Sequence, residues 1–91
     1  MQIRELLITH PLGLHARACA RIVQLASRFR CNVSISIGNR HASARNIVPV
    51  MLLAVSMGAT VRIETEGPDE GAAMTAMVQL IDRGLAERRP G

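Results

Sequence analysis

Val-Ser-Ile-Ser-Ile, at residues 33–37, alternates strictly between apolar and hydroxyl side chains, and Gly-Asn follows at residues 38–39. Alternation with a period of two predicts a strand that is buried on one face and exposed on the other. Gly-Asn is a two-residue turn of the kind found in tight hairpins, so residues 40–44 are expected to pair back as the next strand. This stretch therefore predicts an antiparallel hairpin in the middle of the chain.

Before the hairpin, the sequence predicts a strand at residues 2–8, a Pro- and Gly-containing loop, and a helix from about Ala16 to Phe29. The helix has a polar face formed by Arg17, Arg21, Gln24 and Arg28. The opposite face is apolar and is expected to be buried, with the residues Cys19, Ile22, Val23, Ala26 and Phe29.

After the hairpin, Asn46 is a candidate cap for a short helix that starts at Ile47 and ends near Gly58. Residues 60–66 alternate again and predict a strand. A last helix is expected to begin after a cap at Asp69 and to run to about Leu85. Its core side would hold Met74, Met77, Val78, Ile81 and Leu85.

These elements follow one another in the order βαββαβα. Two strands with one polar face each indicate a sheet that helices cover on one side only. The fold class is therefore α+β, a two-layer open-faced β-sandwich with three helices on one face. A chain of 91 residues is expected to form a single domain over residues 1–91, with residues 86–91 as a frayed tail.

The charge is concentrated in one half of the chain. All eleven basic residues are arginine, and residues 1–45 hold seven of them against one acid. A basic half can attract nucleic acid, a phosphorylated group or an acidic protein. Nucleic acid is the weakest of these expectations, because Phe29 is the only aromatic residue and binders of single strands usually stack bases on aromatic rings.

Other composition signals limit the classes further. Cys19 and Cys31 are too few and too far apart for a zinc site and are expected to be reduced thiols. His10 and His41 are expected to be solvated, so no metal and no cofactor is predicted. The chain has neither a signal peptide nor an apolar run long enough to cross a membrane, which predicts a cytoplasmic protein without membrane insertion.

His15 is the residue best placed for chemistry. It follows a Gly-containing loop and precedes a helix, so the free N–H groups of Ala16 and Arg17 could bind an anion. The guanidinium of Arg17 can hold phosphate oxygens, and Arg21 extends the positive field. A neutral imidazole is a nucleophile near pH 7. On the residues alone, a surface histidine that caps a helix explains the same position.

The stretch Pro-Leu-Gly-Leu-His-Ala-Arg, residues 11–17, resembles the active-site signature of the HPr family, phosphocarriers of the bacterial phosphoenolpyruvate:sugar phosphotransferase system. The resemblance covers about residues 2–85 and includes the order of elements, residues 44–53 and the turn at residues 66–70. It implies that His15 takes a phosphoryl group on Nδ1 from phosphorylated enzyme I, and that Arg17 stabilises it. It also implies an antiparallel sheet of strand order 1-4-2-3.

The sequence departs from the family pattern at three places. Ala18 stands where the family usually has proline. Asn46 stands where many members have a serine that a regulatory kinase phosphorylates, and asparagine has no hydroxyl to modify. The loop His-Pro-Leu at residues 10–12 replaces one that carries asparagine in other members.

The resemblance also implies a docking surface for enzyme I and for the enzyme IIA-type acceptors. Its expected apolar residues are Leu14, Ile47, Val48 and Met51, and its expected basic rim is Arg17, Arg21 and Arg45. The other interpretation of Val48 and Met51 is that they are ordinary core residues of a short helix.

Two alternatives to the carrier remain: a non-catalytic regulatory module that binds a partner on the same fold, and a small basic nucleic-acid-binding protein. A carrier would not turn over by itself and would act as a monomer, because it presents the same face to successive partners. The sequence does not distinguish the sugar branch of the system from the nitrogen-related branch.

Overall fold

The computed structural model describes residues 1–85, and the tail expected at residues 86–91 lies outside the described part. The predicted order βαββαβα is confirmed, with one further π-helical turn after the last helix. The elements are β1 Gln2–Leu7, α1 Ala16–Ala26, β2 Asn32–Ile37, β3 Arg40–Ser43, α2 Ile47–Leu52, β4 Thr60–Glu66, α3 Glu70–Gln79 and η1 Leu80–Gly84.

The strands form an antiparallel sheet in the order β1-β4-β2-β3, which confirms the order that the resemblance implied. β2 and β3 form the predicted hairpin, in which Ile37 pairs with Arg40 across the turn. Gly38 in that turn has a φ of 59°, a left-handed conformation that glycine adopts without a Cβ clash. β4 lies between β1 and β2, so a strand from the C-terminal half joins the N-terminal strand to the hairpin.

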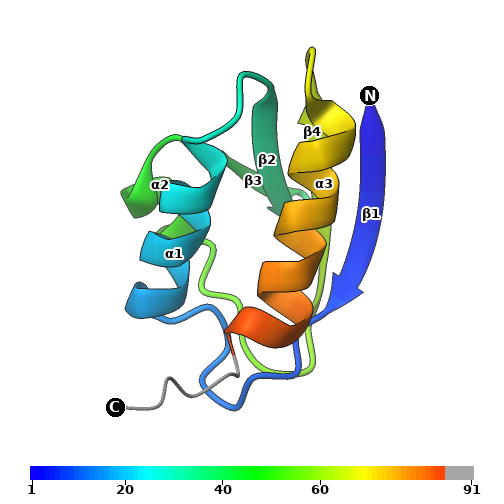
Figure 1. The fold of residues 1–91 in the computed structure, drawn as a ribbon. Coiled ribbons are helices and arrows are strands. Elements are labelled where there is room, and N and C mark those ends of the chain that lie inside the picture. The colour runs from blue at the N-terminus through cyan, green and yellow to red at the C-terminus, as the bar shows by residue number, and fades with distance from the viewer. Residues whose placement is uncertain (86–91) are drawn as a thin grey trace, which may run out of the picture.

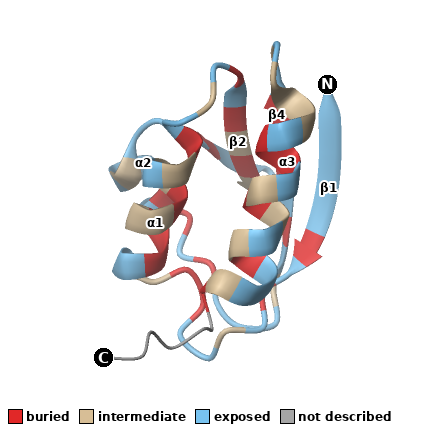
Figure 2. Ribbon diagram, in the orientation of Figure 1, coloured by how far each residue is buried: buried red, intermediate tan, exposed pale blue. Residues whose placement is uncertain are grey.

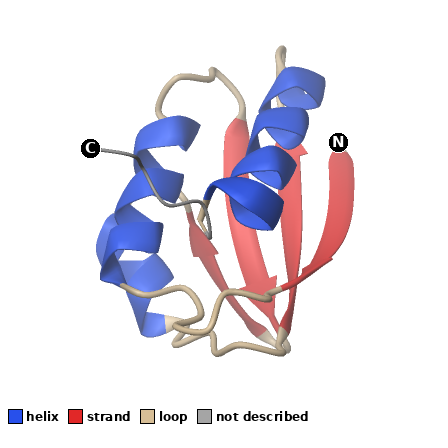
Figure 3. Ribbon diagram, turned by 60° about the horizontal axis from the view of Figure 1, so that its bottom comes forward, coloured by secondary structure: helices blue, strands red, loops and turns tan. Residues whose placement is uncertain are grey.

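Helices cover one face of the sheet and leave the other face open (Figures 1 and 3). In β4 the buried residues are Val61, Ile63 and Thr65, which alternate with Arg62 and Glu64. The last two form an ion pair at 3.3 Å between the Arg62 Nε and Glu64 Oε2 atoms. Burial with a period of two is the pattern expected of a sheet that is covered on one side, so the two-layer α+β prediction is confirmed.

The core lies between the helices and the covered face of the sheet, where the buried residues gather (Figure 2). Most of the residues predicted for the buried faces of the two long helices are indeed buried; Val23, Phe29 and Val78 are only partly buried and pack against the core. The largest side chains that are almost completely buried are Ile8, Ile22, Ile35, Ile63, Met74 and Met77.

The first helix ends three residues before the predicted Phe29. The amides of Arg28 and Phe29 donate to carbonyls three residues back, which tightens the chain into turns after Ala26. The following amides, of Arg30 and Cys31, donate to the carboxylate of Asp69 at 2.9 and 3.0 Å. Asp69 lies at the predicted N-cap position of α3, but its side chain binds this distant loop and makes no capping hydrogen bond to its own helix.

The second helix also ends early, at Leu52 and not near Gly58. It begins at Ile47 as predicted, although the Asn46 side chain makes no capping hydrogen bond. Ala54 adopts a φ of 52°, and a left-handed residue ends a helix. This conformation costs a non-glycine residue roughly 1–2 kcal/mol, so the propensities of the sequence do not predict it.

Candidate functional site

His15 occupies the N-cap position of α1, with φ −74° and ψ 177°. Its carbonyl accepts the Cys19 N–H at 2.9 Å, but its side chain makes no capping hydrogen bond. The half-buried imidazole is therefore not engaged by the helix that it begins. Ala16 and Arg17, both exposed, supply the first N–H groups of the helix, which have no acceptor within it and favour an anion.

The loop before His15 is fixed to the segment that follows α2. Gly13 has a φ of 62°, and a Cβ at this position would collide with the Val55 carbonyl oxygen. The Leu14 N–H donates to that same carbonyl at 3.0 Å. The Leu14 side chain is 5% exposed and belongs to the core, so it does not form part of an exposed docking surface as the sequence suggested. The buried side chain of Leu14 and the bond from its N–H group fix the backbone next to His15.

His10 lies against His15, with the ring centroids 5.0 Å apart and the ring planes at 45°. The Leu12 N–H donates to His10 Nδ1 at 3.0 Å, and the Gly13 N–H donates to the His10 carbonyl at 2.9 Å. His10 is half-buried and therefore only partly solvated, whereas His41 is exposed as expected. Proline and glycine between the two histidines were the signal that a tight turn could bring them together.

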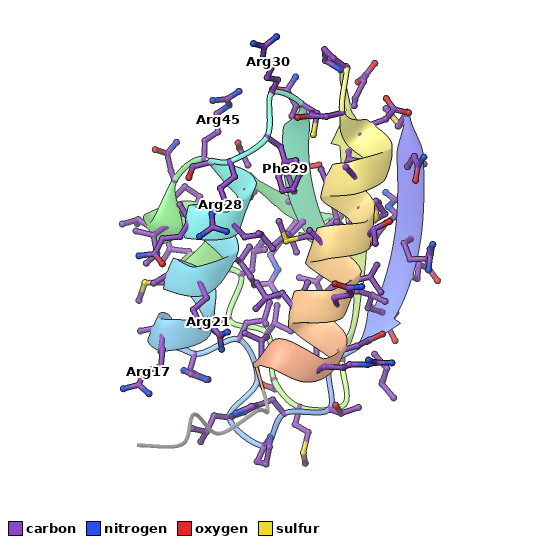
Figure 4. All side chains as sticks on the ribbon, in the orientation of Figure 1. Arg17, Arg21, Arg28, Phe29, Arg30 and Arg45 are labelled. Carbon is purple, nitrogen blue, oxygen red and sulfur yellow. The ribbon has the colours of Figure 1, made fainter. Side chains whose placement is uncertain are left out.

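The three arginines expected around His15 have different surroundings. Arg17 is exposed at the start of α1, whereas Arg45 lies toward the other end of that helix (Figure 4), where it lines a hollow with Ala26 and Ser27. Arg21 is half-buried, and its Nη1 donates to the Gly84 carbonyl at 2.6 Å. Arg17 is thus the arginine of the expected rim that remains both next to His15 and open to a ligand.

Helix α2 lies beside α1, and most of its residues are exposed (Figures 1 and 2). Val48 is 59% exposed and Met51 is 42% exposed, so the interpretation of these two residues as core residues is wrong. Ile47 is half-buried. Leu52, at 72% exposed, extends the apolar surface and was missed by the sequence reasoning, which did not separate it from the buried Leu53.

The two cysteines are free and buried. Cys19 Sγ donates to the Leu14 carbonyl at 3.3 Å, and burial raises the pKa of the Cys19 thiol. Within residues 1–85, no three His, Cys, Asp or Glu side chains gather as a metal site would require. No helix of the described part is both long and apolar enough to cross a membrane.

The chain is similar to known proteins over most of its length. Residues 3–83 match the family described as PTS HPr component, phosphorylation site. The phosphocarrier protein HPr of Cupriavidus necator is 45% identical over 84 residues, which are 92% of this chain and 94% of that protein. The HPr of Xylella fastidiosa strain 9a5c is 43% identical over 91% of this chain and 93% of its own length.

A solved structure gives the same fold. The crystal structure of HPr from Thermoanaerobacter tengcongensis superposes with a TM-score of 0.90 at 36% identity. The alignment covers 98% of this chain and 100% of that one.

Proposed function

We propose that this chain, which belongs to the HPr family of phosphocarriers of the phosphoenolpyruvate:sugar phosphotransferase system, carries its phosphoryl group on the imidazole of His15. One observation supports this assignment above the others. The His15 ring lies at the start of α1 and makes no capping hydrogen bond, and the first amides of the helix and the exposed side chain of Arg17 follow it within two residues. A nucleophile and the donors for the group that it receives are therefore adjacent.

The donor we propose is phosphorylated enzyme I, with its phosphoryl group on a nitrogen atom. The lone pair of His15 Nδ1 forms the new N–P bond while the old P–N bond breaks, and its electron pair returns to the donor nitrogen. The amides of Ala16 and Arg17 would bind the phosphoryl oxygens, and the Arg17 guanidinium would balance their charge. Phosphoryl transfer depends mainly on such positioning and electrostatic stabilisation.

The docking surface we propose joins α2 to the start of α1. It consists of the side chains of Ile47, Val48, Met51 and Leu52 together with Arg17. An apolar surface beside a cation suits an acidic partner and a transient encounter steered by charge. The same surface would serve enzyme I and then an enzyme IIA-type acceptor, which favours a monomeric carrier in the cytoplasm.

Asn46 is exposed next to this surface, at the start of α2. It offers no hydroxyl, so we propose that the carrier is not regulated by phosphorylation at this position.

Ala18 is completely buried, and its methyl group packs into the core where the family usually has proline. The first turn of α1 is then held by packing in place of a fixed proline ring.

The test is the mass of the intact protein after incubation with phosphoenolpyruvate and enzyme I, with the sugar-branch and the nitrogen-branch enzymes in parallel. We expect one acid-labile phosphate on the wild type and on His41→Ala, whose side chain is exposed on β3, and none on His15→Ala. The branch whose enzyme I phosphorylates the wild type identifies the donor.

No phosphate from either enzyme I, when each is shown to be active on another carrier, would contradict the carrier function. That result would favour the regulatory module that binds partners without passing phosphate. Phosphate retained on His15→Ala would place the site elsewhere in the chain.

A further inference from the structure

The turn between β1 and α1 holds a second imidazole beside the proposed phosphorylation site. His10 is fixed at two atoms: its Nδ1 accepts the Leu12 N–H at 3.0 Å, and its carbonyl accepts the Gly13 N–H at 2.9 Å. Gly13 in turn lies close to the Val55 carbonyl, which accepts the N–H of the next residue, Leu14, at 3.0 Å. The ring of His10 is therefore held at a defined place, 5.0 Å from the ring of His15.

The hydrogen bond from Leu12 determines which nitrogen of His10 carries the proton. A nitrogen that accepts an N–H bond must keep its lone pair, so the neutral ring bears its hydrogen on Nε2. No side-chain hydrogen bond within residues 1–85 uses that N–H group. His10 thus presents a fixed donor that no other residue of the described part uses.

We propose that His10 is a further phosphoryl-binding residue, whose Nε2–H donates to an oxygen of the phosphoryl group on His15. This inference rests on the proposed function of His15. Ring centroids 5.0 Å apart leave the ring edges within reach of a group the size of a phosphoryl. A phosphoryl oxygen accepts an N–H bond at roughly 2.7–2.9 Å. The donor set for the bound group then comes from two sides: the amides of α1 and Arg17 on one, and the turn before His15 on the other.

A structural explanation of His10 makes a different prediction. If the side chain only closes the turn through Nδ1, any side chain that accepts the Leu12 N–H replaces it. Asparagine and serine both accept the N–H two residues on, as Asx and ST turns, but neither has a ring that reaches His15. The variants His10→Asn and His10→Ser therefore keep the turn and remove the proposed donor.

The experiment measures the equilibrium distribution of phosphate between enzyme I and the carrier, by intact mass, for the wild type and both variants. We expect the ratio of phosphorylated to free carrier to fall roughly tenfold in His10→Asn and His10→Ser, because a hydrogen bond to a charged group is lost. His41→Asn, which removes an exposed histidine from β3, should leave the ratio unchanged. Thermal unfolding checks that each variant folds.

The outcomes separate this inference from the function on which it depends. A wild-type ratio in both His10→Asn and His10→Ser overturns the phosphoryl-binding role and leaves His15 as the carrier. A wild type that takes no phosphate overturns both. A third variant, His10→Ala, removes both the closing bond of the turn and the ring. A lowered ratio in His10→Ala together with a wild-type ratio in His10→Asn would assign His10 to the turn alone.

Discussion

Arg21 and Gly84 are 63 positions apart in the sequence, yet the Arg21 guanidinium donates to the Gly84 carbonyl at 2.6 Å. The contact joins the second turn of α1 to the π-helical turn η1 at the end of α3. Carbonyls at a helix C-terminus have no partner within the helix, and a cation there is favoured by the helix dipole. Arg21 thus holds the helix that carries His15 against the last helix of the described chain.

We therefore expect Arg21→Ala to lower the free energy of unfolding by about 1–2 kcal/mol, since a charge-assisted hydrogen bond is lost at a half-buried site. Urea denaturation measures the change. Arg28→Ala is the control for loss of an arginine, because Arg28 is exposed two residues after the end of the same helix and its loss should cost less than about 0.5 kcal/mol. Equal effects in the two variants would show that the contact with Gly84 does not stabilise the fold.

Arg17→Ala should slow phosphoryl transfer to the carrier by roughly ten- to a hundredfold, because a donor to the transferred group is removed. Arg17 is exposed, so stability should not change. Initial rates with enzyme I measure the effect, and Arg28→Ala removes the same charge from the turn that follows the other end of α1. If Arg28→Ala slows transfer as much, the total charge of the helix matters and not the position of Arg17.

Gly13→Ala should destabilise the protein by roughly 2–4 kcal/mol, because the new methyl group would collide with the Val55 carbonyl at a left-handed backbone. Gly38→Ala is a close control. Its φ is 59° against 62° at Gly13, but nothing lies within 4 Å of the added Cβ. It should cost only the conformational term of about 1–2 kcal/mol. Thermal unfolding of the two variants separates the effect of the collision from that of backbone strain. Equal losses of stability would show that the collision contributes nothing.

Asp69 should make stability depend on pH at the acid end. The Arg30 N–H, and then the Cys31 thiol and N–H, bind its carboxylate and lower the pKa of Asp69 in the folded state. A lowered folded-state pKa stabilises the protein above the unfolded-state value of about 4, and this contribution is lost as the pH falls through the folded-state value.

The difference in unfolding free energy between wild type and Asp69→Asn should accordingly shrink as the pH falls below about 4. Glu70, whose pKa is lowered mainly by the N-terminal ammonium group, is present in both proteins, so its contribution to the difference cancels. Chemical denaturation at several pH values provides the comparison. A difference that stays constant with pH would mean that the Asp69 charge does not hold the loop.

The strands were predictable because burial on one face leaves a period of two in the sequence. β2 and β4 follow that period, and each lies within one residue of its predicted bounds. The sheet order came from the resemblance to a family and not from periodicity. Helix ends were less predictable, because the chain that follows α1 is held by a distant residue: the carboxylate of Asp69 accepts the Arg30 and Cys31 N–H groups from 39 and 38 positions away.

The candidate site was predictable where it is local and was missed where it is not. His15 and Arg17 are two residues apart at one helix start, so the sequence itself indicated them. The burial of Leu14 depends on distant segments, and so does the hydrogen bond from Arg21 to the Gly84 carbonyl. Neither leaves a pattern in the neighbouring residues. The contact between His10 and His15 depends on a turn that is closed by a bond from the Leu12 N–H to the His10 side chain. This bond was not predicted from the sequence.

The open face of the sheet has a practical consequence. Glu5 on β1 is exposed and pairs with Arg62 on β4, and the buried neighbours Leu6, Val61 and Ile63 place both residues on the face away from the helices. Both native cysteines are buried, so Glu5→Cys would supply a thiol accessible to a maleimide dye while Cys19 and Cys31 stay protected. A fluorophore attached there would report the arrival and departure of each partner, with the sheet standing between the dye and His15.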